Sequence, residues 1–203
     1  MGLRKGPAIG APGPSCLSWR AGPTNVPAVK AHVLFRAAGA AALAGGALRI
    51  ASSLPLLEDP TALESLYTAI DVLLLFGVIG IYLARAERLG LLGFASFGVA
   101  VAALSFIGGP DADPFGFSTY QEGAAALAIA MVGLSIAWLR VRERPLLPPL
   151  LWFASVIAAG VLAMLPAPLP NYGLMAAGVL FGAAFMSAGW DLLRRNFGGV
   201  DRT

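Results

Sequence analysis

Residues 66–85 read LYTAIDVLLLFGVIGIYLAR, an apolar run with one acid, Asp71, inside it and one arginine, Arg85, at its end. A helix of about 20 such residues, rising about 1.5 Å per residue, crosses the hydrocarbon core of a bilayer. The sequence therefore predicts an all-α integral membrane protein, a bundle of six transmembrane helices. The other five predicted spans cover residues 31–54, 89–108, 119–141, 146–165 and 172–194.

The composition supports a membrane environment. Of the 203 residues, 58% are hydrophobic and 12% are charged, and the mean hydropathy is +0.77. Soluble domains are about 45–50% apolar and about 25% charged. The net charge of +3 comes from basic residues that flank the spans and form no stripe on a soluble face. The predicted partner is therefore the lipid bilayer, and nucleic acid is excluded.

Loop charges set the predicted orientation. The first and third loops carry acids and no Lys or Arg, whereas the second and fourth loops and both terminal flanks are basic. Basic loops stay in the cytoplasm, so both chain ends are predicted to be cytoplasmic. The alanine-, glycine- and arginine-rich composition favours a bacterial cytoplasmic (inner) membrane. Residues 1–30 and 196–203 are predicted to be cytoplasmic tails, the first disordered, around a transmembrane domain of residues 31–195.

Two ionisable residues fall inside the apolar spans, away from the basic ends. Arg49 lies near the predicted outer end of the first span, and Asp71 lies near the outer start of the second. Both lie roughly 7–8 Å below the outer boundary, at about 1.5 Å per residue. Because unpaired charges are costly inside a bilayer, we predict an ion pair between Arg49 and Asp71. It acts either as a clamp between helices or as part of a site. The alternative is that the Arg49 side chain snorkels toward the acidic loop instead of pairing with Asp71.

Further polar residues gather at the same depth and predict a small outward-facing pocket. Tyr67 precedes Asp71 by one helical turn, and Glu64 continues that face outward. Tyr120 and Glu122 begin the fourth span. The alternatives are an aromatic belt for Tyr120 and Tyr172 and a favourable helix-dipole interaction for Glu122.

Small residues predict close helix packing. Gly178 and Gly182 form a GxxxG pattern in the sixth span, which allows two helix backbones to approach each other. Packing within the bundle is the first interpretation. The alternative is a contact with a second copy or with another membrane protein.

The sequence contains no motif for catalysis, for a metal or for a cofactor, so none of these is predicted. Ser105 and Ser135 are expected to bond to backbone rather than to act as nucleophiles. A non-enzymatic scaffold, assembly factor or accessory subunit is the first functional hypothesis. The second is a small transporter or channel with a polar pocket around Arg49 and Asp71. The third is an intramembrane enzyme pairing Asp71 with Glu64 or Glu122.

Overall fold

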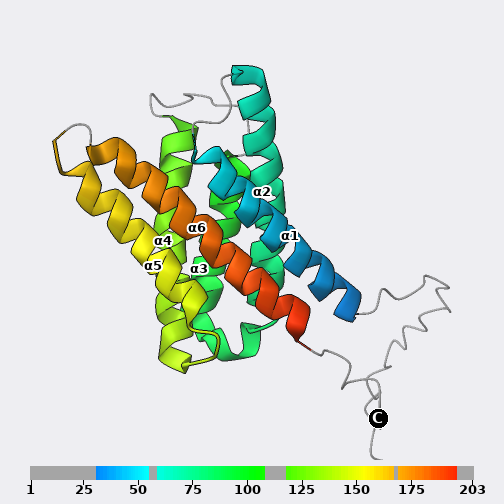
Figure 1. Ribbon diagram of the computed structural model, residues 1–203. Helices are drawn as coiled ribbons and strands as arrows, with labels where there is room; N and C mark the ends of the chain where they lie inside the picture. The colour runs from blue at the N-terminus through cyan, green and yellow to red at the C-terminus, as the bar shows by residue number, and fades with distance from the viewer. Residues whose placement is uncertain (1–30, 55–58, 108–117, 167–168, 196–203) are drawn as a thin grey trace, which may run out of the picture.

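The computed structural model describes residues 31–54, 59–107, 118–166 and 169–195, which form helices without strands. Five of these helices are long and apolar enough to cross a membrane. The predicted six-helix, all-α fold class is thereby confirmed. The tails predicted for residues 1–30 and 196–203 lie outside the described residues. The helices are α1 Ala31–Ser52, α2 Pro60–Leu83, α3 Ala86–Ile107, α4 Thr119–Val141, α5 Leu147–Ala163 and α6 Leu169–Arg194 (Figure 1).

Local signals explain where α2 and α4 begin. The α4 bounds agree with the prediction, and the hydroxyl of Ser118 caps the helix by accepting a hydrogen bond from the Gln121 backbone N–H. The α2 helix begins at Pro60, earlier than the predicted residue 66, because proline is favoured in the first helical turn.

The fifth helix is shorter than the predicted span 146–165. It has 17 residues and is the one helix not long enough by itself to count as a full span. Its length is about 25 Å, against the roughly 30 Å of a bilayer core. The helix ends at Ala163, and Pro166 lies shortly beyond it, where a proline cannot continue the hydrogen-bond ladder.

Near its start, α3 is interrupted at one glycine. Gly90 has φ 61° and ψ −163°, a conformation open essentially to glycine alone. The first turn of α3 is therefore set at an angle to the remainder, which forms the apolar span.

The six helices form a closed ring in chain order, with α1 packed against α6 as well as α2. In Figure 1, α5, α6 and α1 run diagonally across the front, and α2, α3 and α4 stand more upright behind them. The start of α1, the end of α6 and the α2–α3 and α4–α5 turns share one end of the bundle, here called the basic end. The opposite end, which carries Asp59, Glu64 and Glu122, is here called the acidic end.

The contact between α1 and α6 depends on glycines from both helices. A Cβ atom added at Gly182 would lie 2.5 Å from the backbone oxygen of Gly46, and one at Gly39 would lie 2.9 Å from that of Gly189. An added Cβ at Gly178 would collide with the side chain of Ser53. The GxxxG pattern therefore packs against α1 of the same chain, as the first interpretation expected.

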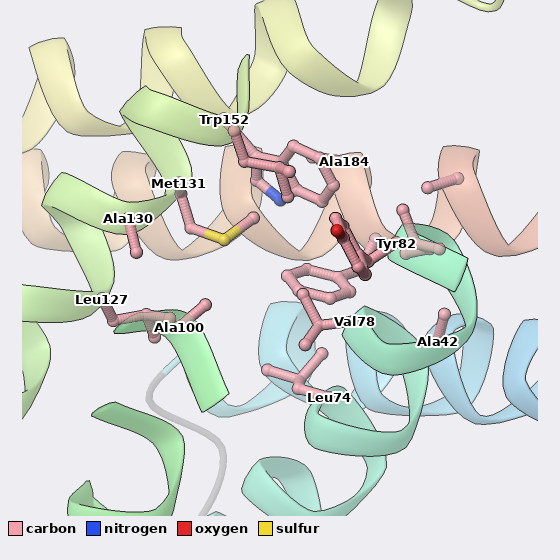
Figure 2. Close-up of a cluster of buried hydrophobic side chains, with 14 of the residues drawn as sticks. Ala42, Leu74, Val78, Tyr82, Ala100, Leu127, Ala130, Met131, Trp152 and Ala184 are labelled. Carbon is pink, nitrogen blue, oxygen red and sulfur yellow. The ribbon is translucent and has the colours of Figure 1, made fainter. Parts of the chain in front are cut away.

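The core lies between the two groups of helices. Figure 2 shows side chains of α2, including Leu74 and Val78, converging with Met131 of α4 and Trp152 of α5. Val78, Met131 and Trp152 are fully buried. This packed layer occupies the middle of the bundle and separates its two ends.

Candidate functional site

A cleft of about 550 Å³ opens in the acidic half of the bundle, and all six helices contribute to its wall. Its volume is within the range of small-molecule sites, about 300–1,000 Å³. Apolar side chains make up most of the wall. The polar residues on the wall are Arg49, Ser52, Ser53, Tyr67, Asp71 and Ser155.

Arg49 and Asp71 reach the cleft from neighbouring helices. Arg49 stands in the last turn of α1, and Asp71 lies near the middle of α2. Both side chains are half-buried, and their charges attract each other across the cleft. Among the described residues, however, neither forms an ion pair within 4.0 Å. The direct Arg49–Asp71 ion pair therefore stays a prediction, although both residues line one cavity.

Tyr67 and two serines complete the polar part of the cleft. The Arg49 guanidinium carbon lies 6.0 Å from the centre of the Tyr67 ring, at the limit of a cation–π contact. The hydroxyls of Ser52 and Ser53 donate to the Arg49 backbone oxygen at 3.0 and 2.9 Å. Because a hydroxyl also has two acceptor lone pairs, both serines can still accept a hydrogen bond from a ligand.

The two acids of the predicted pocket do not join this wall. Glu64 and Glu122 are exposed at the acidic end and are absent from the cleft lining. The side chain of Tyr120 lies outside the described part of the chain. The sequence placed Glu64 on the same helical face as Tyr67 and Asp71, but α2 begins further out than predicted, so Glu64 sits beyond the cleft.

An aromatic column closes the cleft toward the basic end. Phe181 lies on the cleft wall, and its ring centre is 5.1 Å from that of Phe185. Trp152 follows at 5.2 Å from Phe185, and Trp138 at 6.1 Å from Trp152. The last three side chains are fully buried, so the column fills the space between the cleft and the basic end.

A cluster of charges lies where this column ends. The guanidinium of Arg85, in the α2–α3 turn, stacks 4.0 Å from the centre of the Trp138 ring and donates hydrogen bonds to Asp191 of α6 and to the Ile81 backbone oxygen. Arg195 donates to both Asp191 and Glu143, at 2.8 and 2.9 Å. We call Arg85, Glu143, Asp191 and Arg195 the basic-end cluster; it ties three segments of the chain together.

Arg85 is the centre of this cluster, and its side chain is 0% exposed. Burial lowers its pKa to about 10, helped by the nearby charge of Arg195 and opposed by Asp191 and Glu143. The group still carries a positive charge at neutral pH. In the sequence, Arg85 stands out only as one of the basic residues that indicate orientation. The sequence signal that could have revealed the cluster is the presence of two acids, Glu143 and Asp191, among the arginines at the basic end.

The serines expected to bond to backbone do so. Ser105 donates to the Val101 oxygen at 2.9 Å, and Ser135 to the Met131 oxygen at 2.7 Å. Within the described ranges, no group of three or more His, Cys, Asp or Glu side chains is placed to hold a metal ion.

Comparison of the chain with protein families, with curated proteins and with solved structures finds no match. Function is therefore inferred from the cleft and its surroundings.

Proposed function

We propose that the protein is a small transporter that binds its solute in the cleft from the acidic end. The observation that carries the proposal is the placing of two opposite charges, Arg49 and Asp71, on the wall of one cleft inside a membrane-type bundle. Ionisable residues at such depth are costly and mark binding sites or ion pathways in membrane proteins. The aromatic column lies between the cleft and the basic end, which supports entry of the solute from the acidic end.

A scaffold or accessory subunit is the second candidate. The densely packed middle of the bundle and the basic-end cluster favour it, because they give a rigid body. A partner or a second copy would have to use a surface other than Gly178 and Gly182, which α1 covers. A scaffold does not require a cleft that holds two opposite charges. We therefore rank the transporter above the scaffold.

The enzyme hypothesis finds less support. It requires a second carboxylate beside Asp71, and neither Glu64 nor Glu122 lies on the cleft wall. We therefore do not propose it.

Filling the cleft tests the binding proposal. Ala128 of α4 lines the cleft, and Ala125 of the same helix is exposed outside it. We expect small-molecule fractions of a cell extract to raise the melting temperature of the wild-type protein and of Ala125→Phe in nanodiscs. They should leave that of Ala128→Phe unchanged, because the ring occupies the ligand volume. No stabilising fraction, or equal responses of the two variants, would contradict binding in the cleft.

Cysteine labelling separates a transporter from a one-sided binding protein. The cysteine is introduced as Ala128→Cys together with Cys16→Ser, the native chain having one cysteine. A transporter exposes its site alternately to both sides, so a membrane-impermeant maleimide should react in vesicles of either orientation. Exposed Glu122→Cys is the control and should react from the acidic end only. Reaction of Ala128→Cys from that end alone would contradict transport.

A further inference from the structure

We infer that the ligand of the cleft is a small zwitterion that carries an apolar substituent. This inference rests on the proposed function and names its substrate class. It starts from the two charges on the cleft wall, whose closest oppositely charged atoms are more than 4.0 Å apart in the structure.

Opposite charges held apart favour a ligand with both signs. A purely anionic ligand would pair with Arg49 and repel Asp71, and a purely cationic ligand would do the reverse. In a partly desolvated site, leaving a charge without a partner is expensive. A zwitterion places its anionic group on the Arg49 guanidinium and its ammonium on the Asp71 carboxylate. Both charges of the cleft are then paired, and the net charge of the site does not change.

The rest of the wall accounts for the substituent. Leu74, Leu127 and Phe181 line the cleft together with further aliphatic side chains, and polar atoms are confined to the residues named above. An aliphatic or aromatic group in contact with this wall gains about 25 cal/mol per Å² of apolar surface removed from water. Strongly polar zwitterions without such a group, for example glycine, should therefore bind more weakly.

Two sources supply this chemistry, a free amino acid in water and the headgroup of a zwitterionic lipid. Both present an ammonium and an acid anion on one short unit. The cleft opens at the acidic half of a bundle that lipid surrounds, so both can approach it. The experiment therefore contains one arm for each source.

The test uses the full chain in nanodiscs and probes that keep the apolar group and differ in which charged groups they carry. For the free solute these are L-leucine, 4-methylpentanoate without the ammonium, and 3-methylbutylamine without the carboxylate. For the lipid they are dihexanoyl phosphatidylethanolamine and the anionic dihexanoyl phosphatidylglycerol. We expect a zwitterion from at least one arm to bind roughly tenfold or more tightly than its single-charge analogues, measured by calorimetry. The responding arm identifies the source.

Variants that remove one charge each locate the charges. Asp71→Asn and Arg49→Gln should each weaken zwitterion binding by roughly tenfold or more. Asp71→Asn should also reduce the difference in affinity between the zwitterion and the anionic analogue, because the carboxylate that repels the anion is gone. Glu122→Gln, an exposed acid outside the cleft, is the matched control and should bind like wild type. The analogue comparison on the wild-type chain decides the matter if a variant does not fold.

The outcomes separate the two proposals. Equal binding of a single-charge analogue would overturn the zwitterion assignment and leave the cleft a binding site. A second outcome has the same meaning. If neither zwitterion binds, but extract fractions still raise the melting temperature of the wild type and not that of Ala128→Phe, the zwitterion assignment is wrong and the cleft remains a binding site. Failure of all probes together with equal responses of the two Phe variants would overturn both proposals.

Discussion

Burial and neighbouring side chains determine how the charge of Arg85 contributes to the structure. Its side chain is fully buried, stacked on Trp138 and bonded to Asp191, whereas Arg88 one turn later is 69% exposed and lies 3.4 Å from Glu143. Both arginines read alike in the sequence. Arg85 Nε and Glu143 Oε2 are buried without hydrogen-bond partners among the described residues, so the cluster is not satisfied at every atom. Its stabilising effect comes from keeping buried charges together.

Replacing each arginine by alanine should separate these roles. Arg85→Ala leaves Asp191 and Glu143 partly or fully buried with only the more exposed Arg88 and Arg195 beside them, and we expect a loss of about 3–5 kcal/mol in the free energy of unfolding. Arg88→Ala removes an exposed contact to the same Glu143 and should cost about 0–1 kcal/mol. Denaturant unfolding in mixed micelles measures both. Similar losses for the two variants would contradict the assignment of Arg85 as the centre of the cluster.

Among the helices, the pairing of α1 with α6 closes the ring. Without a hydrophobic driving force between helices in lipid, close backbone packing supplies the attraction. Glycines on both helices permit it, and they bring the first and last spans of the chain together. This pairing also places Arg49, at the end of α1, beside the wall that α6 contributes to the cleft.

A single methyl group should disturb this pairing. The added Cβ of Gly182→Ala would lie 2.5 Å from the Gly46 oxygen and 2.8 Å from Ile50 Cγ1, so we expect a destabilisation of about 1–3 kcal/mol. Gly160→Ala in α5 meets nothing within 4 Å and serves as the control. Alanine has the higher helix propensity, so that variant should be neutral or more stable by up to about 1 kcal/mol. Thermal unfolding compares the two glycine variants. Equal melting temperatures would contradict the close packing of α1 against α6 at Gly182.

At the scale of the whole molecule, charged residues and the cleft are distributed unevenly between the two ends of the bundle. The cleft with Arg49 and Asp71 lies in the acidic half, the aromatic column follows, and the basic-end cluster ties the other end. Since basic segments stay in the cytoplasm, the cleft should face the exterior.

Accessibility labelling checks this orientation on intact cells. In a Cys16→Ser background, Glu122→Cys at the acidic end should react with an impermeant maleimide without permeabilisation. Glu87→Cys, exposed in the first turn of α3 at the basic end, should react only after permeabilisation. The opposite pattern would invert the bundle and place the cleft in the cytoplasm.

Sequence reasoning reached the helices because their signal is local. Span 119–141 was placed correctly, since apolar length and a capping serine decide it, and α5 came out shorter because proline chemistry ends it early. For the site, depth along two spans was enough to select Arg49 and Asp71. It also selected Glu64 and Glu122, because position along a span does not show which side chains reach the cleft.

By itself, the sequence determined that the helices are long and apolar enough to cross a membrane and which end of the bundle is basic. It also placed the helix ends to within three residues, apart from the start of α2 at Pro60. Those properties follow from hydropathy and charge along the chain. Only the tertiary structure decided that α1 packs on α6, that Arg49 and Asp71 share a cleft, and that Arg85 is buried with Asp191 and Glu143. These depend on contacts between helices distant in sequence, where backbone approach and side-chain direction, rather than local composition, select the neighbours.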